Sequence, residues 1–404
     1  MFPALRRHLP AGPGGGTLAA CCAAHVVHDG LSALLYVLLP LWQSALGLSL
    51  SDAGLLRALY SGVFAGFQAP AGFLGERLGE RAVMAAGTAL AGAGFLLVGL
   101  WGGLGVAALI PALAVAGLGA ATQHPLGSSL TARAFEGTGQ RAALATYNFA
   151  GDIGKMAVPA LAALLIAVTG WADTCAILGV LALAAALGVM LAVPPLSAPH
   201  PATSGERRVT EEPALPAPLA RQGMIALSAI GVVDSAARAG FLTFLPFLLA
   251  ARGISVPLIG AALTAVFLGG AGGKFVCGVL ANRVGVLRTV LITEIATGLG
   301  IAALLMAPLP VILALLVPLG AVLNGTSSVL YCTVAELVPT ERRARAFAFF
   351  YTVTIGASAL SPALFGLIGD AAGIDRTMAL TATLVLAVLP LTLPLRPVLA
   401  ARRG

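Results

Sequence analysis

Long apolar stretches separated by short polar segments dominate this chain. A helix needs about 20 mostly apolar residues to cross a hydrocarbon core of about 30 Å, and the chain offers twelve stretches of this kind. Glycine, proline and arginine mark their ends. We expect spans at residues 17–45, 53–75, 82–101, 104–132, 142–169, 172–194, 222–251, 257–281, 286–307, 309–335, 345–369 and 374–395.

One polar segment divides the spans into two sets of six. Residues 195–221 are rich in proline, serine and charge, and such a composition cannot bury a core. We therefore predict a flexible cytoplasmic linker between an N-terminal six-helix bundle, residues 1–194, and a C-terminal six-helix bundle, residues 222–404.

The two halves match each other at an offset of 206 residues. Leu39-Pro40 corresponds to Leu245-Pro246, and Gly47 corresponds to Gly253 in the same ungapped register. A parallel duplication of six spans is typical of secondary transporters, whose substrate site lies near the bilayer midplane between the repeats. The pattern thus predicts an all-α membrane protein of twelve transmembrane helices in two pseudo-symmetric bundles.

Composition and charge agree with a membrane protein. The chain is 59% hydrophobic and 10% charged, whereas soluble domains are about 25% charged. If both termini are cytoplasmic, seventeen arginines lie on inner segments and three on outer ones, so the net charge of +7 is a topology signal that needs no nucleic-acid partner. We predict a multi-pass, monomeric protein of a bacterial inner (plasma) membrane, with the lipid bilayer as its surroundings.

Several classes of function find no support in the sequence. The five cysteines show no C-x-x-C spacing, so neither a disulfide framework nor a zinc site is indicated. A P-loop for ATP is lacking, and so is a nucleophile–base pattern, which argues against an ATP-driven pump and against an enzyme. No cofactor is expected.

Two loop motifs carry a family resemblance. The segment Gly72-Phe-Leu-Gly-Glu76-Arg77-Leu-Gly79-Glu80-Arg81 resembles the signature between helices 2 and 3 of the major facilitator superfamily. Its second copy begins at Gly278 and contains Arg283. The resemblance implies the major facilitator fold and alternating access. It also implies that Gly72, Glu76, Arg77, Arg81, Gly278 and Arg283 act in gating, although Glu76 replaces the usual aspartate and Glu80 a usual basic residue.

A narrower resemblance involves helices 1, 4 and 5. His25-x-x-x-Asp29, His124-Pro125 and the segment from Asn148 to Gly154 are similar to the fosmidomycin-resistance branch of drug exporters. That likeness implies proton-driven efflux of small drugs, including a phosphonate anion. The antiporter signature of helix 5 is not cleanly present, because Gly151, Gly154 and Pro159 have a different spacing.

Charged residues inside the spans are the strongest candidates for function. A charge at membrane depth costs from about 2.5 to over 10 kcal/mol, so it marks a functional site by default. Lys155 is far from both ends of its span and needs a carboxylate or an anionic ligand; Asp152, three residues earlier, is the predicted partner, with a purely structural pair as the alternative. Lys274 either faces the cavity or snorkels toward the cytoplasm.

Carboxylates and histidines are candidates for carrying protons. His25, His28 and Asp29 share one face of the first span by their spacing. Asp29 is the favoured proton carrier over Asp152, and the same His/Asp face is an alternative site for a divalent metal ion. Further proton-coupling candidates are Asp152 and Asp234, with Glu294 assigned a structural or interfacial pair. Candidate substrate contacts are Lys155, Arg238, Lys274, Gln123, His124, Tyr147, Asn148, Asn324 and Tyr351.

The balance of these charges predicts the substrate class. Three cations face three carboxylates within the spans, so protonation of one carboxylate leaves a net positive cavity. We therefore expect a proton-coupled antiporter that exports a small organic anion or amphipathic drug. The open alternatives are a divalent metal-ion exporter and a proton-coupled symporter for organic-anion uptake.

Overall fold

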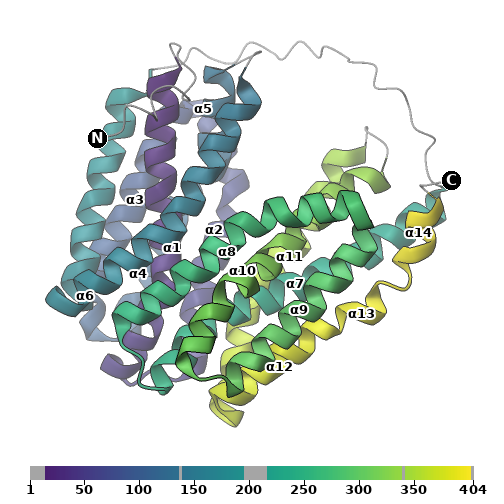
Figure 1. The fold of residues 1–404 in the computed structure, drawn as a ribbon. Coiled ribbons are helices and arrows are strands. Elements are labelled where there is room, and N and C mark those ends of the chain that lie inside the picture. The colour runs from purple at the N-terminus through teal and green to yellow at the C-terminus, as the bar shows by residue number, and fades with distance from the viewer. Residues whose placement is uncertain (1–13, 136–138, 195–215, 339–341, 402–404) are drawn as a thin grey trace. The chain divides into compact units, whose positions relative to one another are not determined.

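The computed structural model describes residues 14–135, 139–194, 216–338 and 342–401, and every element in them is helical (Figure 1). The chain divides into two compact units. Unit 1 comprises the described residues within 1–47, 59–201 and 255–264, and unit 2 comprises the described residues within 48–58, 202–254 and 265–404. The predicted all-α class is confirmed.

The described residues of the first half of the chain form seven helical elements. The elements are α1 (Gly15–Leu46), α2 (Leu50–Leu78), α3 (Glu80–Trp101), the short η2 (Gly102–Leu104), α4 (Val106–Ala120), α5 (Gln123–Ala134) and α6 (Gln140–Ala192). Within unit 1, α1 packs along α6, and α3 packs against α4 and α6 (Figure 1). Gly170, with φ 82° and ψ 166°, interrupts α6, so this element joins the two predicted spans 142–169 and 172–194.

The second half repeats the pattern. Its helices are α7 (Ala217–Ala251), α8 (Val256–Val284), α9 (Val286–Met306), α10 (Leu309–Leu337), α11 (Arg343–Ala372), α12 (Ile374–Leu386), α13 (Val388–Leu391) and α14 (Leu395–Ala401). Within unit 2, α7 packs against α10, α11 and α12, while α9 packs against α10 and α12.

The helices coincide with the twelve predicted spans. Ten helices in the described residues are long and apolar enough to cross a membrane, with α6 counted once and the more polar α2 left out. Of the predicted linker 195–221, residues 195–215 lie outside the described part of the chain. The α7 helix begins at Ala217, within the stretch assigned to that linker.

Backbone geometry repeats at the predicted offset. Gly47 and Gly253 both have positive φ, at 68° and 73°, and each follows the first helix of its repeat. Gly79 and Gly285 have φ of 94° and 89° and precede α3 and α9. Only glycine adopts such backbone conformations readily, so the paired glycines preserve the same turns in both repeats.

Small residues allow the helices to approach closely, as is usual in membrane bundles. A Cβ added to Gly94 of α3 would lie 2.6 Å from the Cβ of Ala116 in α4. In unit 2, Gly269 and Gly273 of α8 contact the backbone of α10 at Val317 and Ala321. The glycine-rich stretch before Lys274 therefore serves helix packing.

Candidate functional site

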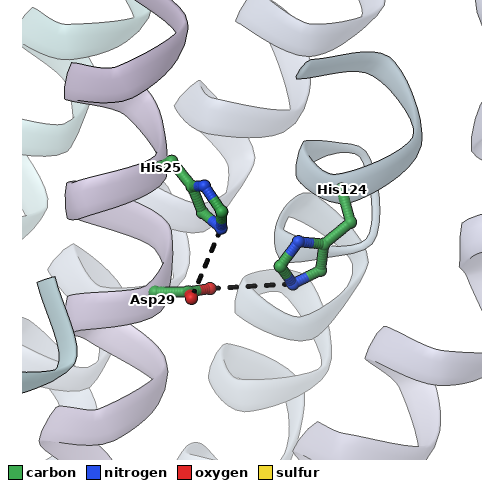
Figure 2. Close-up of side chains that lie close together, drawn as sticks. All are labelled: His25, Asp29 and His124. Atoms are coloured by element: carbon green, nitrogen blue, oxygen red, sulfur yellow. Dashed lines mark ion pairs between the residues drawn. The ribbon is translucent and has the colours of Figure 1, made fainter. Parts of the chain in front are cut away.

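The Asp29 carboxylate is the centre of a charged cluster within unit 1. Its Oδ2 atom lies 2.9 Å from Lys155 Nζ and 3.3 Å from His25 Nε2. Its Oδ1 atom lies 3.7 Å from His124 Nε2, and Figure 2 shows both imidazoles directed at the carboxylate. Helices α1, α5 and α6 thus bring together residues separated by up to 130 positions; we call Asp29, His25, His124 and Lys155 the Asp29 cluster.

Glycines on α6 make room for this cluster. A Cβ on Gly151 would lie 2.6 Å from both Asp29 Oδ2 and His25 Nε2. Gly154, one turn later, lies against the backbone of Val26. Because neither position tolerates a larger side chain without displacement, these glycines allow α6 to place Lys155 against α1.

Lys155 has two carboxylate neighbours. Its Nζ atom is 3.7 Å from Asp152 Oδ1, the partner predicted from helical spacing, and 2.9 Å from Asp29 Oδ2. The closer contact is therefore with a different helix.

Hydrogen bonding fixes the orientation of His25. Its Nδ1 atom lies 2.8 Å from the backbone carbonyl of Tyr147, and a carbonyl can only accept, so Nδ1 carries a hydrogen. The Nε2 atom then faces the Asp29 carboxylate either as a bare lone pair or as the second N–H of an imidazolium. A proton between Nε2 and Oδ2 removes the repulsion between two acceptors.

Tyr147 and Gln123 pack beside the cluster. Both side chains are fully buried, and the Tyr147 ring stacks on His25 with centroids 4.2 Å apart. The Tyr147 hydroxyl donates to the Gln123 carbonyl at 3.0 Å. Of these two predicted substrate contacts, Tyr147 therefore holds His25 in place, and Gln123 holds Tyr147.

His28 faces away from the cluster. Its Nε2 atom lies 3.0 Å from Thr88 Oγ1 on α3, and the Thr88 hydroxyl donates to the Met84 carbonyl at 2.8 Å. The threonine oxygen must then accept, so Nε2 of His28 carries a hydrogen. Its Nδ1 atom is buried without a hydrogen-bond partner, which favours the neutral ring over an imidazolium with a second, unpaired N–H. The shared face predicted for the three α1 residues thus splits between two neighbours.

Burial differs across the cluster. The Asp29 side chain is 8% exposed, whereas those of Lys155 and His124 are 35% and 38% exposed. The buried carboxylate is therefore covered by two groups that remain accessible and can receive an anionic ligand.

Three members of the Asp29 cluster, His25, Asp29 and His124, offer a partial metal site. The ligand atoms of His25, Asp29 and His124 lie within 4.8 Å of one another, and two imidazoles with a carboxylate suit divalent transition metals. Lys155 opposes this use, because its ammonium group contacts the same Asp29 oxygen as His25. A metal ion would have to displace it.

Unit 2 holds a second charged pair, made by two residues that the sequence analysis singled out separately. Arg238 Nη2 lies 3.6 Å from Asp234 Oδ2 and donates to Ser235 Oγ at 3.2 Å.

Other predicted substrate contacts have partners within unit 2. Asn324 Nδ2 donates to the Gly320 carbonyl at 3.0 Å, and Tyr351 stacks on Tyr331. The remaining predicted contacts, Lys274 and Asn148, have exposed side chains.

The predicted gating residues lie at the ends of helices. Glu76, Arg77 and Arg283 are exposed, and Gly72 and Gly278 have open space beside them. Arg81 Nη1 donates to the Val193 carbonyl at 3.1 Å.

Glu80, which departs from the family pattern, accepts hydrogen bonds from Ser129 at 2.5 Å and Arg133 at 3.2 Å. That acidic residue therefore ties the start of α3 to α5.

Sequence reasoning missed two contacts. The Lys155–Asp29 pair joins α6 to α1, and helical spacing can only propose partners on the same helix. Glu294 was assigned no functional role, yet its side chain is buried beside Asp234. The offset of 206 residues relates Asp234 and Glu294 to His28 and Thr88, but the contact between His28 and Thr88 is itself seen only in the structure, so no sequence signal revealed the second contact.

Comparisons with known proteins give a consistent result. A family model described as Major Facilitator Superfamily matches residues 21–236 and 227–403. Two structures of a bacterial homologue of the human lysosomal transporter Spinster, both inward-facing, one unoccupied and one occupied, each give a TM-score of 0.75. They are 15% and 14% identical, covering 97% and 95% of this chain and 98% and 97% of the homologue. No curated protein matches.

Proposed function

Because the chain belongs to the Major Facilitator Superfamily, we propose that it is a proton-coupled secondary transporter of a small organic anion, working by alternating access. The superfamily match establishes a transporter, and the Asp29 cluster supports the substrate class and the coupling ion. The contact between Lys155 and Asp29 is the observation that carries the proposal.

Lys155 is the anion-binding group in this proposal. Its ammonium group is part-exposed, so a carboxylate, phosphonate or phosphate of the substrate can reach it. His124 lies beside it with similar exposure and can donate a second hydrogen bond to the same anion. An anion bound to Lys155 replaces Asp29 as the closest counter-ion of the ammonium group.

Asp29 then becomes the proton carrier. Once Lys155 turns to the substrate, a carboxylate that is 8% exposed loses its closest cation, and burial favours its neutral form. His25, whose Nε2 faces Asp29, passes the proton to it or shares it. Proton binding and anion binding therefore support each other.

This linkage bears on the direction of transport. Ligands that assist each other's binding cross the membrane together, so an anion moves with the proton. The Lys155–Asp29 contact thus favours uptake by symport for an anionic substrate, in place of the export expected from the sequence. Export by antiport suits an amphipathic drug with a positive charge, because that drug competes with the proton for Asp29.

Purified protein in liposomes tests the proposal. An imposed pH gradient, acidic outside with the membrane potential clamped, should drive accumulation of radiolabelled organic anions from a panel of carboxylates and phosphonates. The proposal fails if no anion accumulates under either sign of the gradient. It also fails if Lys155→Met transports as well as the unaltered protein.

Asp29→Asn separates binding from coupling. The amide cannot hold Lys155 as an ion pair or carry a proton, so the anion should exchange across the membrane while gradient-driven accumulation is lost. Counterflow and accumulation assays on the same vesicles measure the two activities. Equal loss of both would remove Asp29 from the proton-carrying role.

A divalent metal ion as substrate is a second candidate, supported by the convergence of His25, Asp29 and His124. Calorimetric titration with Zn²⁺, Ni²⁺ and Mn²⁺ distinguishes it. Metal transport requires binding that His124→Ala abolishes and that Lys155→Met strengthens by removing the competing charge. Anion transport predicts no such strengthening.

A further inference from the structure

Unit 2 contains two carboxyl groups in mutual contact. Asp234 on α7 and Glu294 on α9 lie within hydrogen-bonding distance of each other. Asp234 is 5% exposed and Glu294 is 2% exposed. Neither residue belongs to the Asp29 cluster, which lies in unit 1.

A hydrogen bond between two carboxyl groups requires a proton. An ionised carboxylate can only accept, so one member of the pair must carry an O–H. Two adjacent ionised carboxylates out of water would repel each other, and sharing one proton relieves that repulsion. The pair then holds one negative charge.

Arg238 balances that charge. Its Nη2 atom lies 3.6 Å from Asp234 Oδ2, beyond hydrogen-bonding distance, and that oxygen is buried with no hydrogen-bond partner. One guanidinium therefore compensates one carboxylate, while a second carboxylate would be uncompensated. The electrostatics favour a single shared proton.

The other side chains found beside the pair in the described part of the chain are uncharged. Thr326 of α10 is within hydrogen-bonding distance of Glu294, and the Tyr331 phenol of α10 lies near Asp234 and Arg238. The other charged side chains of α9 to α12 stand near helix ends: Arg288 in α9, Glu336 in α10, Arg343, Arg345 and Asp370 in α11, and Asp375 and Arg376 in α12. Lys274 lies within α8, which packs on α10. Among the described residues, Arg238 is thus the cation that acts on both carboxyl groups.

The internal repeat supports the contact. At the offset of 206 residues, Asp234 and Glu294 correspond to His28 and Thr88, which hydrogen bond across α1 and α3 at 3.0 Å. The same two backbone positions therefore face each other in both repeats. In unit 1 they hold a neutral pair, and in unit 2 two acids.

We propose that Asp234 and Glu294 share one proton and form a proton-binding site in unit 2, separate from the Asp29 cluster. The site takes up its proton from water when the pair is doubly ionised and releases it as the reverse step. It requires no substrate, so it stands or falls independently of the anion proposed for Lys155.

Infrared spectroscopy of the purified protein at neutral pH tests this site, with the spectrum of each variant subtracted from that of the unaltered protein. In Glu294→Gln, the remaining Asp234 balances Arg238 as a carboxylate, so the spectrum should lose the band of one protonated carboxyl group. Asp234→Asn should lose the same band, because Glu294 then balances Arg238. Glu336→Gln, an exposed acid of the same unit, should lose none.

The double variant distinguishes a shared proton from two independent ones. Asp234→Asn with Glu294→Gln should lose no more of the protonated-carboxyl band than either single variant. A loss equal to twice the single loss overturns the shared proton, and unchanged bands in folded Glu294→Gln overturn the site. Thermal unfolding of each variant verifies folding, and Glu294→Gln alone decides the matter if Asp234→Asn does not fold.

Discussion

At the scale of single residues, the Asp29 carboxylate is unusual because three basic groups converge on it. Lys155 and His25 share its Oδ2 atom, and His124 approaches Oδ1. A buried ion is stabilised only while its partners are present, so a change at one member shifts the others. The cluster therefore acts as one unit.

A double-mutant cycle measures this coupling. Lys155→Met should lower the melting temperature, because it leaves a buried carboxylate without its closest cation. Asp29→Asn with Lys155→Met should recover much of that loss, with an interaction energy of about 0.5–3 kcal/mol, the range for contacting residues. Additive effects in thermal unfolding would show that the two side chains do not interact.

Gly151→Ala tests the close approach of α6 to the cluster. The added methyl group would lie 2.6 Å from Asp29 Oδ2 and His25 Nε2, and overpacking of this kind costs about 1–3 kcal/mol. We expect a lower melting temperature and reduced transport. Gly188→Ala on the same helix is the control, since its Cβ would have open space and its stability should be retained.

The limits of sequence reasoning are visible in these residues. Lys155 and Asp29 could each be identified as functional, because a charge in a hydrophobic span is costly wherever its partner lies. Their contact could not be predicted, since it depends on how α6 packs on α1 through Gly151 and Gly154. His28 shared the predicted face with His25, but α3 supplies it with Thr88 as a different partner.

At the scale of elements, the lengths of the apolar stretches and the glycine, proline and arginine residues at their ends predicted the helices well. The kink at Gly170 separates two spans that form one continuous element, and α4 and α5 share one predicted span. Span boundaries follow from the cost of burying polar backbone and side chains in lipid, which the sequence displays directly. Breaks within a span depend on how the helices pack, which the sequence does not show directly.

The turns after α1 and α7 allow a matched prediction. Gly47 and Gly253 have positive φ, and a Cβ at either would meet nothing within 4 Å. Alanine should therefore destabilise both turns only through backbone strain, by about 1–2 kcal/mol each. Asparagine, which tolerates the left-handed region, should cost less in the same thermal unfolding assay. Unequal costs at the two turns would contradict the repeat.

At the scale of the whole molecule, the distribution of arginines predicts the orientation in the membrane. With cytoplasmic termini, the segment between α3 and α4 faces outward, and Gly103 within it is exposed. A membrane-impermeant thiol reagent should label Gly103→Cys in intact cells, in a variant without the native cysteines. A cysteine appended after Gly404 should react only after permeabilisation; the reverse pattern would invert the topology.

The matched turns at Gly79 and Gly285 bear on the evolutionary history of the chain. An ancestor with a single six-helix repeat would have assembled as a homodimer, in which every ionisable side chain occurred twice. Fusion into one polypeptide ended that constraint. One repeat could then acquire Lys155 while the other acquired Glu294. Substitutions can now change the substrate specificity of one repeat without changing the ionisable side chains of the other.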